Sequence, residues 1–495
     1  MEVELQKCPM QKLIHYLVII LSLSFPATSN AQGQDWSLKD EITLWKSNDY
    51  LKHAGIGIYL QNAETGEVLA ETDPQLSLAP GSTLKLVTTA TAIEILGSDF
   101  RFETELCYSG EIKHDTLFGD LIIVGGADPA LGSKYFKEHY LKNHFLDEWS
   151  TAVKELNISH ITGNLITDAT IFEEQMVPNT WIWEDLGNYY GAGASGISVY
   201  DNMYQIHFSS PAVAGELTTL KYTKPFIPNL EINNEVRSSD VNRDLAYVFG
   251  APMVNQRTIR GTIPKGRNDF IIKASVPNPP YLLAWNFKSR LSDAQITLGG
   301  LIESQQSNLK DSSTHLIAKT TSPPLLDIIR VTNHESVNLF AEHLLKYLAY
   351  MIHGQGSTKK GIDVITDFWE KRGIDMDGLF MADGSGLSHF NCLTAKQMVQ
   401  IMYYMKNQSP EGENWFSSLP YVPDGTLYYF NPINFPGKTL RAKSGSMTRV
   451  RCYAGELITH NKQPILFAIF LNNFNCKQSQ AIKLVEGLLV TISKN

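Results

Sequence analysis

The spacing of hydrophobic residues near the start of the chain predicts a strand pair followed by a helix. Residues 55–70 hold two apolar runs on either side of the turn Glu64-Thr65-Gly66, a pattern typical of a β-hairpin. Pro80-Gly81 then interrupts the chain, and apolar residues recur from Leu86 to Leu96 at intervals of three and four. This spacing predicts a helix that begins close to Ser82.

A different pattern fills residues 100–312. Short apolar runs such as Asp120-Leu121-Ile122-Ile123-Val124 are separated by clusters of Gly, Pro and Asn, which is typical of strands joined by turns. A segment of about 200 residues is too long for a loop and is long enough to form domains of its own. We therefore predict a strand-rich insert of one or two domains.

Helical spacing returns in the last third of the chain and is followed by strand patterns. Helices are predicted over residues 325–350, 361–372 and 394–405, strands over 440–446, 453–459 and 464–471, and a closing helix over 481–492. We expect the first hairpin and the last strands to share one antiparallel sheet flanked by helices, which is an α+β fold. The insert would interrupt that domain.

The N-terminal residues predict an export signal. Lys7 and Lys12 precede an apolar stretch over residues 13–25, and Ser29-Asn30-Ala31 resembles a small-residue cleavage site. The stretch is shorter than the roughly 20 residues that span a bilayer, and His15 interrupts it. We predict a cleaved signal peptide over residues 1–31 and no stable membrane span afterwards, with an uncleaved anchor as the alternative.

The predicted domain boundaries follow from these changes of pattern. Residues 32–103 and 313–495 would form one domain, and residues 104–312 would form the inserted part. The chain has 495 residues, of which 43% are hydrophobic and 19% are charged, as expected of a folded protein with more than one domain.

Charge and cysteine content argue against two kinds of partner. The net charge is −9, and no long run of Lys or Arg occurs, so nucleic acid is not an expected partner. Beyond the signal, the cysteines lack the close spacing of metal ligands, so neither a metal nor another cofactor is expected. A disulfide and separate buried thiols are both left open for Cys107, Cys392, Cys452 and Cys476.

The motif Ser82-Thr83-Leu84-Lys85 predicts a nucleophile with its base. At the start of a helix, residues three apart lie on one face, so the Lys85 amine can reach the Ser82 hydroxyl. Such a lysine needs a lowered pKa, from burial or from a second cation such as Lys443. Backbone amides beside Ser82 could stabilise an oxyanion. Two other Ser-x-x-Lys matches, at residues 307–310 and 357–360, lack the Pro-Gly break and the apolar helix.

Two further motifs complete a candidate site. Ser336-Val337-Asn338 lies in or just before a predicted helix, where Ser and Asn could instead cap the helix end. Lys443-Ser444-Gly445 lies in a predicted strand, where Lys443 could instead keep an edge strand soluble. Glycine at position 445 would let a substrate backbone approach such a strand closely.

These motifs occur in the order found in one known family. The chain resembles the low-molecular-mass class C penicillin-binding proteins, the family of D-alanyl-D-alanine carboxypeptidases and endopeptidases. The resemblance covers nearly all of the mature sequence and rests on longer matches in the same order, namely PGSTLKLVTTATAIEILG, GDLIIVGGADPAL, ITGNLITDATIF, SVNLFAEHLL, DGSGLS and RAKSGSM.

The resemblance implies a role for each site residue. Ser82 would be acylated, Lys85 would take its proton, and Ser336 with Lys443 would pass a proton to the leaving amine. Asn338 would hold the substrate amide and position Lys85. The amides of Ser82 and Ser446 would form the oxyanion hole, and the hydroxyls of Ser444 and Ser446, on either side of Gly445, would bind the terminal carboxylate. Threonine is commoner than serine at positions 444 and 446, so substrate affinity could differ while the chemistry is retained.

The leading hypothesis is a periplasmic serine carboxypeptidase that acts on peptidoglycan stem peptides through an acyl-enzyme and is inhibited by β-lactam antibiotics. Endopeptidase action on cross-links is left open. One alternative is a serine β-lactamase, which would hydrolyse penicillin rapidly. The other is a non-catalytic cell-wall binding protein, in which Ser82 would not react with penicillin. The sequence leaves the oligomeric state unknown.

Overall fold

The computed structural model describes residues 37–141, 144–305 and 314–494. The predicted signal peptide lies outside these residues. Among the residues described, none of the helices combines the length and apolar character that a membrane crossing requires.

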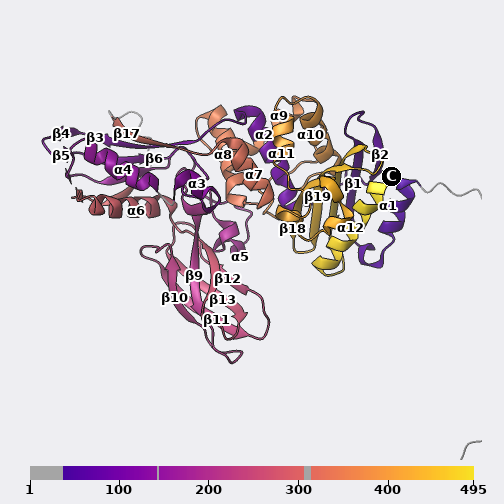
Figure 1. Ribbon diagram of the computed structural model, residues 1–495, viewed down its shortest axis with the longest axis horizontal. Helices are drawn as coiled ribbons and strands as arrows, with labels where there is room; N and C mark the ends of the chain where they lie inside the picture. Colours follow the sequence, from indigo (N-terminus) through magenta and orange to yellow (C-terminus); the bar gives the residue numbers. More distant parts are fainter. Residues whose placement is uncertain (1–36, 142–143, 306–313, 495) are drawn as a thin grey trace, which may run out of the picture. The chain divides into compact units, whose positions relative to one another are not determined.

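A five-stranded sheet joins the two ends of the chain (Figure 1). Every neighbouring pair is antiparallel, and β1 pairs with β20 so that Gly55 lies opposite Asn472. The α+β fold predicted from the sequence is thereby confirmed. The strands, in their order across the sheet, are β18 (Leu440–Met447), β19 (Val450–Ile458), β20 (Pro464–Asn472), β1 (Gly55–Asn62) and β2 (Val68–Thr72).

Both faces of this sheet are covered by helices, which explains why β20 is apolar at nearly every position. Leu466, Ala468 and Phe470 point into the core formed with α2 and α10, whereas Phe467 and Ile469 point into the core formed with α1 and α12. Successive side chains of a strand face opposite sides, so a strand buried on both faces has no polar alternation.

The helices predicted in this part of the chain are present except that one is divided, and two further helices, Leu38–Lys46 and Gly412–Ser417, were not predicted. The single helix predicted over residues 325–350 is wrong, because the chain breaks at Ser336, whose φ is 58°. The helices are α1 (Leu38–Lys46), α2 (Lys85–Leu96), α7 (Leu325–His334), α8 (Asn338–His353), α9 (Thr358–Glu370), α10 (Ala395–Asn407), α11 (Gly412–Ser417) and α12 (Gln478–Lys494).

The insert is rich in strands, as predicted. Its largest sheet is mixed and is covered by α4 (His144–Glu155) and α6 (Pro279–Asp293). The strands of that sheet, in order, are β16 (Ile302–Gln305), β8 (Leu165–Asp168), β6 (Leu121–Val124), β3 (Glu103–Ser109) and β17 (Thr314–Thr321).

Three smaller sheets complete the insert. A four-stranded one contains β15 (Thr297–Leu298), β7 (His160–Ile161), β5 (Thr116–Phe118) and β4 (Glu111–Lys113). The two three-stranded ones contain β10 (Thr219–Lys224), β9 (Met203–Ser209) and β14 (Phe270–Ser275), and β11 (Glu231–Ser239), β13 (Gln256–Pro264) and β12 (Leu245–Phe249). The short helices α3 (Lys137–Tyr140) and α5 (Trp183–Leu186) connect them.

Helix α2 is buried along most of its length, and its polar side chains are hydrogen-bonded within the core. Thr88 donates to the carbonyl of Gly384 at 2.7 Å, and Thr91 accepts a 2.9 Å bond from the indole of Trp369. Buried hydroxyls with such partners fix a helix in position, because displacing it would leave polar groups unsatisfied. The helix that follows the Ser82 turn is therefore held firmly.

The segment that leads into this turn is held by Asn472 of β20. Its side-chain oxygen accepts from the amide of Ala79 at 2.9 Å, and its Nδ2 donates to the carbonyl of Ala79 at 3.1 Å. Asn472 is buried, so both bonds are made away from solvent. This pair of bonds fixes the chain three residues before Ser82.

We expect Asn472→Ala to lower the free energy of unfolding by about 1–3 kcal/mol, because the partly buried Ala79 amide loses its Asn472 partner and the Ala79 carbonyl keeps only the 3.4 Å contact from Cys452 Sγ. Chemical denaturation followed by circular dichroism measures this change. Asn268→Ala, at an exposed side chain, is the matched control and should change stability by less than about 0.5 kcal/mol. Equal stabilities of the two variants would contradict the assigned role of Asn472.

Candidate active site

The Ser82 hydroxyl lies within hydrogen-bonding distance of the Lys85 amine. Ser82 belongs to a short 3-10 helix, η2 (Gly81–Leu84), and Lys85 is the first residue of α2. The distance between Lys85 Nζ and Ser82 Oγ is 3.1 Å. The Pro-Gly break and the spacing of three residues therefore place the two groups together, as the sequence predicted.

Lys85 is completely buried and is surrounded by oxygen atoms. Besides Ser82, its Nζ donates to Asn338 Oδ1 at 2.6 Å and to the carbonyl of Ser385 at 2.6 Å. Burial disfavours the charged ammonium and lowers the pKa of Lys85 to about 7, although the carboxylates of Asp383 and Glu342 act in the opposite direction. An amine with such a pKa can accept a proton near neutral pH.

The loop that contains Ser385 is built around two buried acids. Asp383 accepts four hydrogen bonds, from the amides of Gly386 and Ser388, the side-chain amide of Asn391 and the indole of Trp181. Glu342 accepts from the amide of Gly384 at 3.1 and 3.2 Å, and burial raises its pKa to about 8. The sequence analysis did not identify the Ser385 carbonyl as a partner of Lys85.

Ser336 and Lys443 form a second hydroxyl–amine pair. Lys443 Nζ donates to Ser336 Oγ at 3.0 Å and to the carbonyl of Ser444 at 2.7 Å. Lys443 is completely buried, and burial together with the charge of Lys85 holds its pKa well below the usual range. The charge of Lys85 thus lowers the pKa of Lys443. The pKa of Lys85 itself is lowered by burial.

The alternative structural interpretations of the second and third motifs are wrong. Val337, the apolar middle residue of the second motif, occupies the capping position of α8, and neither Ser336 nor Asn338 caps that helix. Asn338 instead bonds Lys85 and donates to the carbonyl of Tyr190 at 2.8 Å. Although β18 is an edge strand, Lys443 does not face solvent.

Glycine at two positions lets β18 and the Ser82 turn approach each other. A Cβ atom on Gly445 would lie 2.2 Å from the Pro80 carbonyl and 3.0 Å from the Ser82 amide nitrogen. A Cβ atom on Gly81, whose φ is 51°, would lie 3.0 Å from the Ser446 amide nitrogen. The absence of a Cβ atom at these two positions therefore lets the backbone around Ser446 approach the backbone around Ser82.

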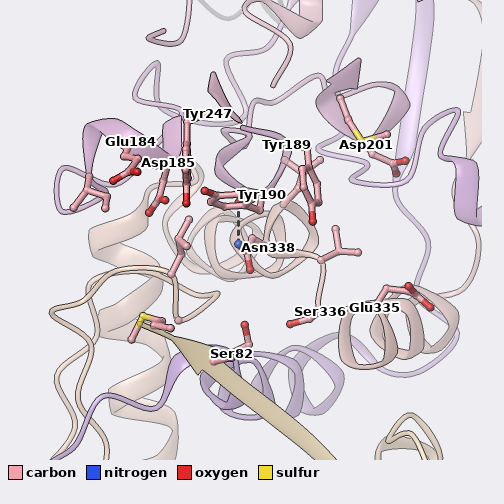
Figure 2. Close-up of a pocket in the computed structure, with 18 of the residues that line it drawn as sticks. Ser82, Glu184, Asp185, Tyr189, Tyr190, Asp201, Tyr247, Glu335, Ser336 and Asn338 are labelled. Atoms are coloured by element: carbon pink, nitrogen blue, oxygen red, sulfur yellow. Dashed lines mark hydrogen bonds between the residues drawn. The ribbon is translucent and has the colours of Figure 1, made fainter. Parts of the chain in front are cut away.

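Figure 2 shows the cavity onto which these groups open. Its volume is about 520 Å³, and Ser82, Ser336, Asn338 and Ser446 line it. Lys85 and Lys443 lie behind this surface, out of contact with solvent. The hydroxyls are therefore accessible from the cavity while the amines are not.

The insert supplies the opposite wall of the cavity. Sequence reasoning missed these residues, because no local pattern indicates which parts of an insert return to a site. They are Lys134, Tyr135, Ile182, Glu184, Asp185, Tyr189, Tyr190, Asp201, Met203 and Tyr247.

The placement of the His, Cys, Asp and Glu side chains decides whether the described residues could hold a metal ion or form a disulfide. Within residues 37–141, 144–305 and 314–494, no group of three or more His, Cys, Asp or Glu side chains is placed to hold a metal ion. The open question on the cysteines is answered in favour of thiols, since Cys107, Cys392, Cys452 and Cys476 are all free.

The geometry of the site defines a class of protein. A serine beside a buried amine of lowered pKa, next to a second hydroxyl–lysine pair and two backbone amides, is the arrangement of a serine acyl-transfer enzyme. A family model described as the D-Ala-D-Ala carboxypeptidase 3 (S13) family matches residues 39–490, and the chain belongs to this family. The resemblance and the predicted serine-type D-alanyl-D-alanine carboxypeptidase are thereby confirmed.

Individual relatives agree with the family assignment. The chain is 24% identical over 468 residues to the D-alanyl-D-alanine carboxypeptidase DacB of Haemophilus influenzae, covering 92% of this chain and 91% of that protein. It is 25% identical over 443 residues to the D-alanyl-D-alanine carboxypeptidase of Actinomadura sp. strain R39, covering 87% and 80%.

A solved structure shares the fold. The crystal structure of penicillin binding protein 4 (dacB) from Haemophilus influenzae superposes with a TM-score of 0.78 at 22% identity, covering 89% of this chain and 97% of that chain. The penicillin-recognising fold expected from the resemblance is confirmed.

The pKa of Lys85 predicts a pH profile. Below about pH 7 the amine is protonated and cannot accept the Ser82 proton, so the acylation rate should fall about tenfold per pH unit as the pH decreases. Above about pH 7 the rate should level off. Stopped-flow measurement of acylation by a chromogenic β-lactam between pH 5 and 9 tests this, and a rate that is constant across that range would contradict it.

Proposed function

We propose that the chain removes the terminal D-alanine from peptidoglycan stem peptides through an acyl-enzyme on Ser82, in the periplasm after signal cleavage. The 3.1 Å contact between Lys85 Nζ and Ser82 Oγ supports this most directly, because Lys85 combines that contact with a lowered pKa. The steps below assign one role to each site residue.

Acylation begins with proton transfer from Ser82. The neutral amine of Lys85 takes the hydroxyl proton while Oγ attacks the carbonyl carbon of the penultimate D-alanine. The carbonyl oxygen becomes an oxyanion that accepts hydrogen bonds from the amides of Ser82 and Ser446. Asn338 holds Lys85 through its Oδ1 and is itself held by the Tyr190 carbonyl.

Collapse of this intermediate requires a proton on the leaving nitrogen. Ser336 Oγ donates it and is reprotonated through Lys443, which lies 3.0 Å away. The C–N bond breaks, D-alanine leaves, and an ester joins the stem peptide to Ser82. Attack by water on the ester then releases the shortened peptide and restores the hydroxyl.

The terminal carboxylate of the substrate would be bound by Ser444 and Ser446. Ser446 is exposed and lines the cavity, so its hydroxyl is accessible. Ser444 is nearly buried, and its hydroxyl lies 3.4 Å from the carbonyl of Thr426, a long contact that a carboxylate acceptor could replace.

We also propose that β-lactam antibiotics acylate Ser82. A solved structure of the Haemophilus influenzae penicillin binding protein 4 is described as complexed with a β-lactam; it has a TM-score of 0.74 to this chain at 21% identity and covers 90% of this chain and 97% of that chain. A strained lactam amide would present its carbonyl carbon to Ser82 in the same way as the peptide. A long-lived ester, and not rapid hydrolysis, would distinguish this function from that of a β-lactamase.

The predicted domain boundaries enter the proposal with one change. Strands β3 and β17 pair antiparallel, so that Glu103 lies opposite Thr321 and Ser109 lies opposite Thr314. The chain therefore leaves and re-enters the catalytic part at one place. This supports a peptidase domain interrupted by an insert close to the predicted residues 104–312. Because β17 (Thr314–Thr321) is a strand of the insert's largest sheet, we propose that the insert ends near residue 321 and not at residue 312.

We expect Ser82→Ala to abolish both carboxypeptidase activity and covalent labelling by penicillin, because it removes the nucleophile and leaves the packing of η2 unchanged. Mass spectrometry of the intact protein after incubation with penicillin measures the labelling. Ser77→Ala, at an exposed serine earlier in the same segment, is the matched control and should label normally. A covalent adduct on the Ser82→Ala protein would refute the assignment.

We expect Lys85→Ala to slow acylation about 10²- to 10⁴-fold, because it removes the general base. The second-order rate constant of penicillin labelling measures this effect, with Lys359→Ala at an exposed helix start as the control. Native-like circular dichroism would show that the loss is chemical. Labelling of the Lys85→Ala protein at the native rate would require another base.

A further inference from the structure

A second cavity, of about 820 Å³, lies within the insert next to the active-site cavity. The two cavities share three lining residues, Lys134, Asp201 and Met203. We call the second one the lysine cavity, after the cations among its lining residues, which are Lys134, Lys137, Lys224 and Arg290.

The lysine cavity has an unbalanced positive charge. Asp201 is the one acidic residue among the lining residues described for it. Arg290 is paired with Asp147 and Asp293, whereas Lys137 and Lys224 are exposed and have no acidic partner in the described part of the chain. In a protein of net charge −9, two unpaired lysines around one cavity favour an anionic ligand.

The wall between the two cavities is held in a fixed arrangement. Asp201 accepts hydrogen bonds from the hydroxyl of Ser133 and from the amide of Lys134. Lys134 Nζ lies 3.8 Å from Met203 Sδ, and both residues line both cavities. A ligand long enough to span both cavities would pass these groups.

The lysine cavity adjoins the leaving-group side of the active site. In Figure 2, Asp201 lies on the same side of Ser82 as Ser336, whereas Glu184 and Asp185 lie on the other side. Because the proposed mechanism delivers a proton to the leaving amine through Ser336, the departing part of the substrate lies on that side. A departing D-alanine has one carboxylate, which the proposed mechanism assigns to Ser444 and Ser446, so it requires no group of the lysine cavity.

We propose that the lysine cavity binds carboxylates of the second peptide of a cross-linked peptidoglycan substrate, the strand that departs when the chain acts as an endopeptidase. This inference rests on the proposed function and specifies its substrate class. The same bond type is broken as in the carboxypeptidase reaction. Ser82 Oγ forms an ester bond to the carbonyl carbon of the cross-link amide, the C–N bond breaks, and the amine of the departing peptide takes its proton from Ser336.

Neutral groups around the lysines suit a peptide ligand. The lysine cavity also presents the side chains of Gln205, Asn286 and Ser289, which can bond amide groups between the carboxylates. The two unpaired lysines lie on different elements, with Lys137 on α3 and Lys224 at the end of β10. Two separate carboxylates on one extended strand could therefore be bound at once.

The test compares two reactions of one variant. We expect the double variant Lys137→Glu, Lys224→Glu to lose about tenfold or more in kcat/KM for a cross-linked muropeptide dimer, since two charge pairs become repulsive. Its kcat/KM for a monomeric pentapeptide should stay within about twofold of the native value, because D-alanine makes no contact there. Chromatography with mass detection measures both products.

The matched control carries the same change of charge elsewhere. Lys359→Glu, Lys360→Glu alters two exposed lysines of α9 that line neither cavity, and it should leave both reactions unchanged. Added salt should lower the native activity on the dimer more than that of the Lys137→Glu, Lys224→Glu variant, which a merely structural effect would not produce.

Three outcomes would overturn the proposal. They are an equal loss of kcat/KM in both reactions of the variant, no loss of kcat/KM in either reaction, and a native protein that cleaves the monomer but not the dimer. Penicillin labelling and monomer cleavage report separately on the proposed function. If both of these persist while the dimer result fails, the carboxypeptidase assignment stands and the role of the lysine cavity does not.

Discussion

The structure depends on the complete burial of two lysine amines behind a solvent-accessible pair of serines. Neither Lys85 nor Lys443 makes an ion pair with a carboxylate in the described part of the chain; each is surrounded by hydroxyl, amide and carbonyl oxygens. Burying an ammonium without a counter-ion is expensive, so the charged form is disfavoured and the pKa falls. The free energy that folding loses at these two positions is what makes the amines usable as bases and proton carriers at neutral pH.

That constraint explains why the site is assembled from distant segments. A local helix can bring a hydroxyl to an amine, but it cannot exclude water from the amine on every side. The acidic residues Asp383 and Glu342 order the loop whose Ser385 carbonyl accepts from Lys85, and β18 approaches the Ser82 turn closely at Gly445. The sheet built from both ends of the chain is the element that allows these segments to meet.

The sequence predicted those features of the site and the fold that depend on local spacing. The contact between Ser82 and Lys85 follows from helical geometry, and the strands of the central sheet follow from their apolar runs. The break between α7 and α8 could not be predicted, because a positive φ at a serine has no compositional signal. The Ser385 and Tyr190 carbonyls were missed for a related reason: any residue type supplies a carbonyl, so only the path of the backbone identifies them.

The insert is therefore part of the catalytic machinery and not an appendage. It supplies the Tyr190 carbonyl that holds Asn338, and the Trp181 indole that completes the shell around Asp383. A substrate that fills the active-site cavity must pack against the insert as well as against β18. Because residues of the insert line the active-site cavity, they also influence which amide is presented to Ser82. The breadth of that surface, and the charge of its lysines, favour a substrate larger than one peptide end.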